Sequence, residues 1–312
     1  MEEFDVVIIG AGVAGLSAAL AAANEGMSTL VLERSVPGGH VLSVEQIANY
    51  PGHAGLVSGY DLIPQMQQQA EEAGAEVRSG SVSAITPDGG FFVIENESGD
   101  VRARTTIIAA GSAIKSLGSP SEERLQGRGI SHCAACDGPL NRDRVVAVVG
   151  GGDSALEEAL VVARYASRVL VLHRHEMPTA RPALIDAVMA APNIELMGST
   201  EVIGILGDTE VTGVEVMVLG EMGQLRQIEC HGVFLYPGLV PEGGFLGGLV
   251  SKDEQGRIVT DIMMQTSTPG IFAAGDIRSG SVYLLAAVAG DGATAGVAAA
   301  RYVRARALQQ AA

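Results

Sequence analysis

The sequence predicts an α/β fold with two βαβ units, and three observations support this. The chain has 312 residues, roughly twice the usual size of one domain. Hydrophobic residues make up 47% of the chain and charged residues 18%, which is enough to form a large core. An apolar run followed by a glycine-rich turn and a helical segment occurs twice. A repeat of this kind indicates a duplicated structural unit.

The first βαβ unit is expected at the N-terminus. Residues 4–9 are a short apolar run typical of a buried parallel strand, residues 10–15 read GAGVAG, and residues 16–25 are Ala-rich and suit a helix. A second strand, residues 28–32, is followed by Glu33. The glycines allow backbone N–H groups to approach a pyrophosphate, and an acid at this position accepts hydrogen bonds from ribose hydroxyls. FAD or NAD is therefore expected here.

The second βαβ unit repeats the pattern over residues 144–172. Its turn, residues 150–155, reads GGGDSA, and the position of Glu33 is taken by His173, followed by Arg174. Cations at this position favour a nucleotide with a 2′-phosphate. NADPH is therefore expected in the second unit, although two basic residues at a strand end can also be a solvated surface.

A C-x-x-C motif lies between the two glycine-rich turns. Cys133 and Cys136 are followed by Asp137, and the chain has one further cysteine, Cys230. Two thiols at this spacing can close a small disulfide, and the neighbouring acid can manage protons. A zinc site is the alternative, but structural zinc takes four ligands and no second C-x-x-C is present. We assign redox catalysis to Cys133, Cys136 and Asp137, expect no metal, and expect Cys230 to be a small buried hydrophobic residue.

Composition excludes several classes of partner. The net charge is −16, there is no Trp, and the chain has six Phe and six Tyr, so neither nucleic acid nor an anionic membrane surface is expected to bind. The N-terminal apolar run is preceded by acids and interrupted by glycines, unlike a signal peptide or membrane span. Three cysteines are too few for a disulfide framework, so a cytoplasmic location is expected.

The order of these motifs resembles the low-molecular-weight bacterial thioredoxin reductases, which are FAD- and NAD(P)-dependent pyridine nucleotide-disulfide oxidoreductases. Residues 133–138 read CAACDG, close to the CATCDG of that family. Other family-like segments follow in family order over essentially the whole chain: residues 37–39 (PGG), 49–52 (NYPG), 109–111 (AAG), 173–174 (HR) and 270–276 (GIFAAGD).

The resemblance implies two Rossmann-like domains, the second inserted into the first. The FAD-binding domain would comprise residues 1–112 and 245–312, and residues 115–242 would form the NAD(P)H-binding domain that carries the C-x-x-C. It further implies a homodimer that passes electrons from NADPH through FAD to a Cys133–Cys136 disulfide. The final acceptor would be thioredoxin or a similar protein.

The resemblance also implies residues that contact each cofactor. Those expected at FAD are Gly10, Gly12, Ala14, Gly15, Glu33, Arg34, Gly39, His40, Asn49, Val82, Ala110, Gly111, Gly275, Asp276, Leu285 and Ala286. Those expected at the pyridine nucleotide are Gly150, Gly152, Asp153, Ser154, Ala155, His173, Arg174, His175 and Arg181.

Several positions depart from the family pattern. The family's H-R-R run reads HRH at residues 173–175, and Arg181 stands two residues later than the family's arginine. Leu284 and Leu285 replace an Arg-Gln pair, and His40 replaces a glutamine. A weaker 2′-phosphate site leaves NADH or another donor, such as ferredoxin, as alternatives. A flavin dithiol oxidase acting on a small molecule is a further alternative, which the intact second turn disfavours. A non-catalytic flavoprotein would need no paired cysteines.

Overall fold

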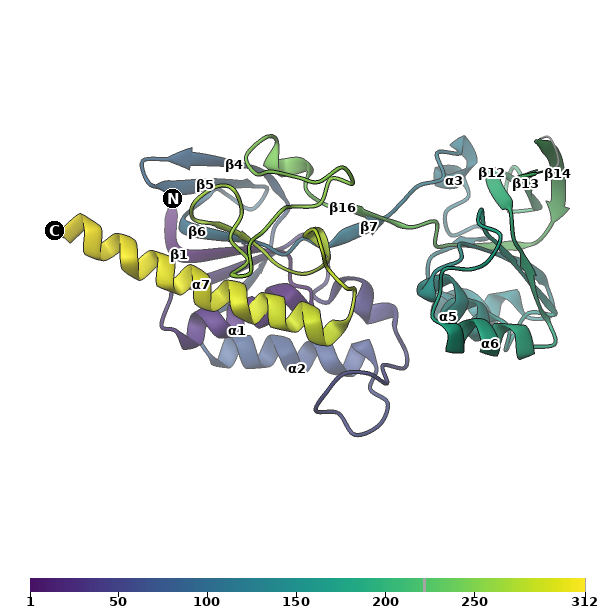
Figure 1. Cartoon of the computed structure of the whole chain (residues 1–312), viewed down its shortest axis with the longest axis horizontal. Coiled ribbons are helices and arrows are strands. Elements are labelled where there is room, and N and C mark those ends of the chain that lie inside the picture. Colours follow the sequence, from purple (N-terminus) through teal and green to yellow (C-terminus); the bar gives the residue numbers. More distant parts are fainter. Residues whose placement is uncertain (221–222, 312) are drawn as a thin grey trace. The chain divides into compact units, whose positions relative to one another are not determined.

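The structure is a computed structural model that describes residues 1–220 and 223–311 (Figure 1). The chain divides into two compact units. Unit 1 comprises Met1–Ala113 and Val240–Ala312, and unit 2 comprises Ile114–Leu239. Each unit contains a parallel sheet with helices, so the expected fold class, in which one Rossmann-like domain is inserted into another, is confirmed. The two crossings, β7 (Ser112–Ile114) and β16 (Leu239–Pro241), are hydrogen bonded to each other.

Unit 1 is built on a seven-stranded sheet of order β3-β2-β1-β6-β5-β4, with β17 beside β6. The strands are β1 (Glu2–Ile9), β2 (Thr29–Glu33), β3 (Glu76–Ser79), β4 (Val82–Asp88), β5 (Phe91–Asn96), β6 (Val101–Ile108) and β17 (Ile271–Ala273). Strands β1, β2, β3, β6 and β17 run parallel, whereas β4 and β5 pair antiparallel. The helices are α1 (Val13–Asn24), α2 (Gly59–Glu72) and α7 (Leu285–Ala311), with short 3-10 turns η1 (Gly39–Ser43), η3 (Gly244–Leu246) and η4 (Gly275–Ile277).

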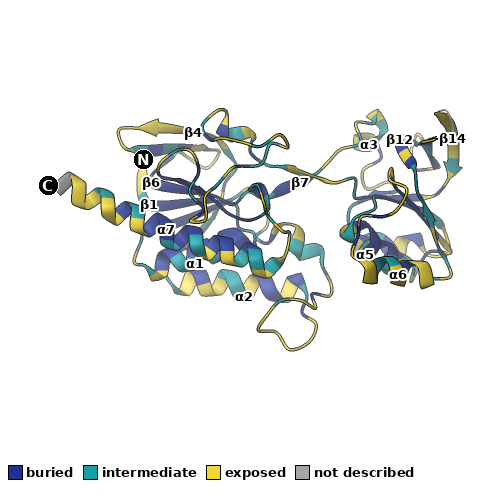
Figure 2. Cartoon of the chain, in the orientation of Figure 1, coloured by how far each residue is buried: buried dark blue, intermediate teal, exposed yellow. Residues whose placement is uncertain are grey.

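The alternation of side chains along β1 explains how this sheet is covered on both faces. Val6 and Ile8 pack with the helices, and Figure 1 shows α1, α2 and α7 on that face. Val7 and Ile9 point the other way and pack with residues of β4, β5 and the segment that follows β16. All four side chains are buried (Figure 2). A strand buried on both faces therefore reads as one continuous apolar run.

Unit 2 has a five-stranded parallel sheet of order β11-β10-β9-β15-β8 and an antiparallel sheet β12-β13-β14. The strands are β8 (Ile130–Ser131), β9 (Val145–Val149), β10 (Arg168–Leu172), β11 (Ile194–Met197), β12 (Thr200–Leu206), β13 (Gly213–Val218), β14 (Gln224–Glu229) and β15 (Gly232–Leu235). The helices are α3 (Pro120–Arg124), α4 (Ala134–Asp137), η2 (Gly138–Asn141), α5 (Asp153–Val162) and α6 (Pro182–Ala190). Helices α5 and α6 cover one face of the parallel sheet, and β12–β14 contribute to the core on the other.

Helices α1 and α5 begin three residues earlier than the sequence pattern predicts, at Val13 and Asp153 rather than at Leu16 and Leu156. The difference arises because each glycine-rich turn itself opens the helix. Gly12 and Gly152 are the N-cap residues and, having no side chain, cap no N–H group. Each turn therefore presents backbone donors at a helix N-terminus.

Helices α1 and α7 lie against each other at unusually short range. A Cβ on Gly292 would stand 2.1 Å from the carbonyl oxygen of Ala14, and one on Gly296 would stand 2.5 Å from that of Ala18. Small residues on both helices allow this backbone approach, which accounts for the Ala-rich composition of α1. None of the described helices is long and apolar enough to span a membrane.

We expect Gly292→Ala to lower the free energy of unfolding by about 1–3 kcal/mol, because the added methyl group must separate α1 from α7. Gly290→Ala is the matched control, because Gly290 is exposed on the same helix and a Cβ there meets no atom within 4 Å. Alanine at position 290 should be neutral or stabilise the helix by up to about 1 kcal/mol. Denaturant unfolding of both variants tests this, and equal effects would contradict the close packing.

Candidate functional site

The first glycine-rich turn packs tightly on one side and is open on the other. Gly10 has a φ of +102°, and a Cβ on it would lie 2.4 Å from the carbonyl oxygen of Ala109 at the end of β6. A Cβ on Gly15 would lie 1.8 Å from the carbonyl oxygen of Gly10, whereas one on Gly12 would meet no atom within 4 Å. Gly10 and Gly15 therefore hold the turn against β6 and α1, and Gly12 leaves room above the helix N-terminus for a ligand.

Glu33 ties the end of β2 to this turn. Its Oε2 accepts the Ala11 N–H at 2.7 Å, and its Oε1 accepts the Ser35 N–H at 3.0 Å. The neighbouring Arg34 forms an ion pair with Glu242, with Nη1 and Oε2 2.7 Å apart. Carboxylate oxygens accept more than one hydrogen bond, so Glu33 retains capacity for a ribose hydroxyl.

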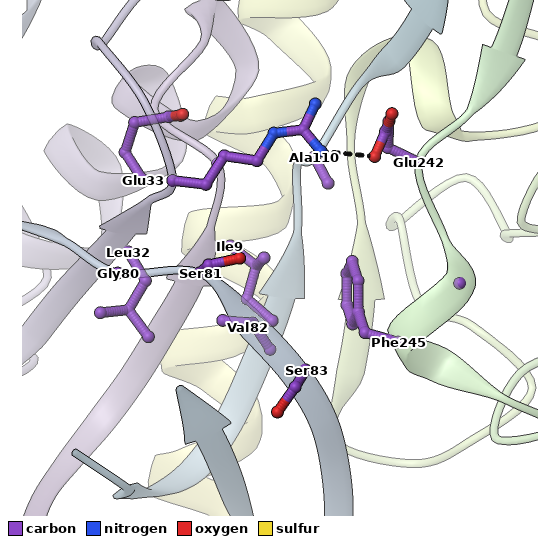
Figure 3. Close-up of a pocket in the computed structure, with 13 residues that line it drawn as sticks. Ile9, Leu32, Glu33, Gly80, Ser81, Val82, Ser83, Ala110, Glu242 and Phe245 are labelled. Carbon is purple, nitrogen blue, oxygen red and sulfur yellow. Dashed lines mark hydrogen bonds and ion pairs between the residues drawn. The ribbon is translucent and has the colours of Figure 1, made fainter. Parts of the chain in front are cut away.

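A cavity of about 290 Å³ opens at the carboxyl ends of β1 and β2 (Figure 3). Five of the expected FAD residues line it: Gly10, Glu33, Arg34, Val82 and Ala110. The sequence missed the other polar and aromatic lining residues, Ser81, Ser83, Glu242 and Phe245. The edge where strands end is where ligands bind in open α/β sheets. With free donors on α1, a mixed polar and aromatic wall and an unobstructed Gly12, these residues fit the adenosine and pyrophosphate of FAD.

A second group of expected FAD residues meets around the start of α7. His40 Nε2 lies 2.6 Å from the carbonyl oxygen of Ser112, next to Gly111, and the Ser112 hydroxyl lies 3.4 Å from the carbonyl oxygen of Asp276. Burial raises the pKa of the Asp276 carboxyl, although the Ser281 hydroxyl donates a hydrogen bond to it at 3.0 Å.

The remaining expected FAD residues of unit 1 lie on four different elements. Gly39 begins η1, Ala14 lies in the first turn of α1, and Leu285 and Ala286 begin α7. Asn49 is exposed on the loop that precedes α2.

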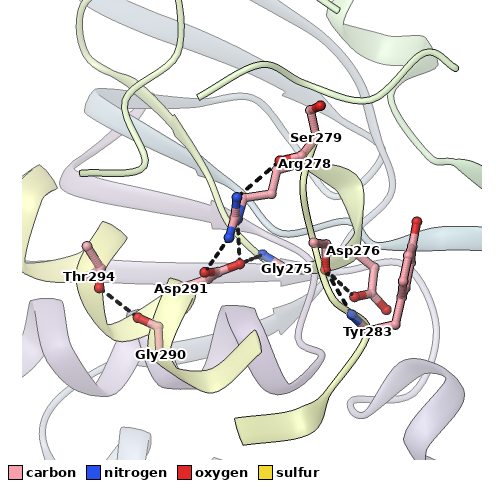
Figure 4. Close-up of polar contacts among 9 residues, drawn as sticks. Gly275, Asp276, Arg278, Ser279, Tyr283, Gly290, Asp291 and Thr294 are labelled. Carbon is pink, nitrogen blue, oxygen red and sulfur yellow. Dashed lines mark hydrogen bonds and ion pairs between the residues drawn. The ribbon is translucent and has the colours of Figure 1, made fainter. Parts of the chain in front are cut away.

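A buried ion pair fixes the loop that carries Gly275 and Asp276 (Figure 4). Arg278 donates from Nε to Asp291 Oδ2 at 2.5 Å and from Nη2 to Oδ1 at 2.8 Å, and both side chains are largely buried. Asp291 Oδ2 also accepts the Gly275 N–H at 3.3 Å. Because Asp291 lies on α7, the pair holds this loop to the helix, and neither Arg278 nor Asp291 stood out in the sequence.

The second glycine-rich turn, in unit 2, has similar geometry. Gly150 has a φ of +135°, and a Cβ on it would lie 2.3 Å from the carbonyl oxygen of Tyr236. Gly152 is open, Ala155 is buried beneath the turn, and Ser154 is exposed. The turn therefore offers the backbone donors of α5 to an anion.

The basic residues expected at the nucleotide differ sharply in their surroundings. His173 is 4% exposed beside Gly151, and burial lowers the pKa of its ring, which disfavours the cationic form at this position. Arg181 is held by two carboxylates, with Nε 2.5 Å from Asp153 Oδ2 and Nη2 2.7 Å from Glu157 Oε1. Arg174 and His175 are exposed.

The C-x-x-C forms a disulfide in a short turn. Cys133 and Cys136 are bonded, with Cα atoms 5.3 Å apart, and the Cys136 N–H lies 3.2 Å from Cys133 Sγ. Cys136 is exposed, Cys133 and Asp137 are half-buried, and the Asp137 N–H donates to the Cys133 carbonyl at 3.1 Å. Cys230 is buried, as expected, and burial raises the pKa of its thiol to about 12. Among the described residues, no group of three His, Cys, Asp or Glu side chains could hold a metal.

The chain is similar to known proteins of one family. The family model for pyridine nucleotide-disulphide oxidoreductases matches residues 4–293. The thioredoxin reductases of Treponema pallidum and Listeria innocua are 38% and 40% identical to this chain over 301 residues, covering 96% of this chain and 97% and 94% of those proteins. The crystal structure of Lactococcus lactis thioredoxin reductase in its FR conformation is 36% identical, with a TM-score of 0.92, and the match covers 97% of this chain and 99% of that one.

We expect Asp276→Asn to raise the Tm of the flavin-free protein by a few degrees at about pH 8 and by less at about pH 5. The folded pKa of Asp276 is raised above its unfolded value. Ionisation of this carboxyl therefore costs no stability below the unfolded pKa, and the cost grows to its full size as the pH rises past the folded pKa. Asp253→Asn is the control, because the Arg257 N–H lowers the pKa of that carboxyl and removing the charge brings no gain. Thermal unfolding at both pH values measures this, and a gain independent of pH would contradict the interpretation.

Proposed function

The chain belongs to the pyridine nucleotide-disulphide oxidoreductase family and is a flavin-dependent disulfide reductase, and we propose that it takes electrons from NADPH and passes them to a thioredoxin. The observation that carries the proposal is the Cys133–Cys136 disulfide, which lies in a short, partly exposed turn of the unit that also has a glycine-rich nucleotide turn. Unit 1 would bind FAD and unit 2 the pyridine nucleotide.

Different residues of unit 1 would bind different parts of FAD. The N-terminal N–H groups of α1 would bind the pyrophosphate, Glu33 a ribose, and the cavity beside Val82 and Phe245 the adenosine. Gly275 and Asp276, held by the Arg278–Asp291 pair, would contact the other half, with α7 starting nearby. When bound, FAD supplies transfer of two electrons between a reduced nicotinamide and a disulfide.

The cysteines and Asp137 perform the thiol chemistry. Reduction of the disulfide takes two electrons and two protons and releases two thiols. The Cys136 N–H lies 3.2 Å from Cys133 Sγ and would stabilise a thiolate there, so we assign attack on the partner's disulfide to Cys133. Attack by Cys133 forms a mixed disulfide with the partner and releases the partner's first thiol. Cys136 then attacks Cys133 Sγ, which breaks the bond to the partner, releases the partner's second thiol and re-forms the Cys133–Cys136 disulfide. Asp137, which adjoins Cys136, is assigned the transfer of protons.

The preference for NADPH rests on Arg174. It is exposed two residues after the end of β10, where the adenosine ribose of a nucleotide bound at residues 150–155 would lie. A guanidinium suits a 2′-phosphate. His173 is buried and Arg181 is paired with carboxylates, so Arg174 carries most of this interaction, with His175 beside it.

We expect anaerobic NADPH to bleach the flavin of the purified protein faster than NADH does. Arg174→Ala should raise the KM for NADPH by about tenfold, through loss of a charge-assisted contact, and leave the KM for NADH nearly unchanged. Arg168→Ala is the control, because Arg168 lies at the other end of β10, where it forms an ion pair with Glu195 of β11 away from the nucleotide turn. If dithionite bleaches the flavin and NADPH at high concentration does not, the donor is another reductant.

Cys136→Ser should abolish reduction of thioredoxin and leave anaerobic reduction of the flavin by NADPH intact, because the two steps use different groups. Cys230→Ala is the control, since that buried thiol takes no part, and it should keep both activities. The first step is measured by flavin absorbance and the second by appearance of thioredoxin thiols. Continued thioredoxin reduction by Cys136→Ser would refute the role of the pair.

A further inference from the structure

Three segments of unit 2 that are far apart in the sequence meet at the turn of residues 133–137, which carries the disulfide and is called the redox turn below. The N–H of Ala134, the residue after Cys133, donates to Glu158 Oε2 at 2.5 Å. The Tyr236 hydroxyl donates to the same oxygen at 3.0 Å. Ala134 lies in α4 and is fully buried, Glu158 lies in α5, and Tyr236 follows β15. A charged side chain thus contacts the backbone of the redox turn from within the unit.

We propose that Glu158, held by Tyr236, is a positioning residue that shifts the dithiol–disulfide equilibrium of Cys133 and Cys136 toward the disulfide. The inference rests on the redox role proposed for the two cysteines. A hydrogen bond to the Ala134 N–H fixes the peptide that joins Cys133 to α4. The Ser131 hydroxyl fixes the peptide on the other side, because it accepts the Cys133 N–H at 3.1 Å.

Electrostatics gives the direction of the effect. A carboxylate one peptide away from Cys133 disfavours a second negative charge, so it raises the pKa of a thiol in the reduced turn. The reduced pair is then less stabilised by ionisation, and its electrons are passed on more readily.

The Tyr236 hydroxyl weakens the effect of the Glu158 charge on the redox turn, because it donates a hydrogen bond to the carboxylate. Burial is the main reason that the pKa of its hydroxyl is raised, and the nearby Glu158 adds to the effect, so the hydroxyl stays a neutral donor near neutral pH. The other titratable groups of the turn are Asp137, which also acts on Tyr236, and His132, whose Nδ1 lies 3.2 Å from the Leu235 carbonyl oxygen.

The test measures the equilibrium directly in the FAD-loaded protein, without NADPH or thioredoxin. Wild type and variants are equilibrated anaerobically with mixtures of reduced and oxidised dithiothreitol, quenched by alkylation, and analysed by mass for the fraction of Cys133–Cys136 disulfide. Rates of alkylation across pH report the thiol pKa, and buried Cys230 with its raised pKa reacts little. Failure of the NADPH or thioredoxin assignments leaves this measurement unaffected.

Glu158→Gln keeps an oxygen that accepts the Ala134 N–H but removes the charge. It should shift the equilibrium toward the dithiol by about three- to tenfold and move the alkylation profile to lower pH. Tyr236→Phe removes a donor from the carboxylate and should shift both quantities the opposite way, by about twofold. A shift toward the dithiol in Glu158→Gln together with a shift toward the disulfide in Tyr236→Phe supports the proposal, and any other pair of results overturns it.

Two controls isolate the charge and the hydroxyl. Glu201→Gln removes an exposed carboxylate of β12, and Tyr165→Phe alters a tyrosine whose ring packs beside Gly138. Both should leave the equilibrium and the pH profile unchanged, and a control that shifts them as much as Glu158→Gln overturns the assignment. If Glu158→Gln does not fold, Tyr236→Phe decides alone: a shift toward the disulfide supports the proposal, and an unchanged equilibrium refutes it.

Discussion

Close approach of backbone to backbone at the two glycine-rich turns is the constraint on which the rest of the structure depends. At Gly10 and Gly150 an added Cβ would stand 2.4 Å and 2.3 Å from a carbonyl oxygen of a neighbouring strand end. Because the turns after β1 and β9 are so tight, α1 and α5 begin within them, with their N-terminal donors at the sheet edge. Close backbone contact also joins two helices of unit 1, because Gly292 and Gly296 let α7 lie against α1. Strand, turn and helix therefore fix one another.

The sequence predicted these parts because they depend on local chemistry. The apolar strands, the two turns, Glu33 and the C-x-x-C each rest on residues close together in the chain, and the fold class followed from their repetition. The wall of the unit 1 cavity could not be predicted in the same way. Ser81 directly precedes β4 and Ser83 lies in it, whereas Glu242 and Phe245 come from the segment after β16, so they meet only once the sheet is assembled. No spacing in the sequence relates residue 81 to residue 245.

Charge could be read from the sequence, but its environment could not. His173 and Arg181 are both basic residues near the second turn, and their type alone suggests a site for phosphate. The fold buries the histidine against Gly151 and surrounds the arginine with Asp153 and Glu157. In unit 1, Arg278 and Asp291, which are 13 residues apart in the chain, form a buried pair that holds the Gly275 loop. Partners at long sequence separation decide what a charge does.

Tyr236 shows how one residue can serve two sites in unit 2. Its carbonyl oxygen is the atom that a side chain at position 150 would strike, so it enforces glycine in the nucleotide turn. Its hydroxyl donates to Glu158, which in turn accepts the Ala134 N–H of the redox turn. Glu158 lies on α5, the helix that begins at the nucleotide turn. A displacement of α5 at its N-terminus would therefore reach the redox turn through the rigid helix and the hydrogen bond between Glu158 and the Ala134 N–H, because the helix carries the carboxylate with it.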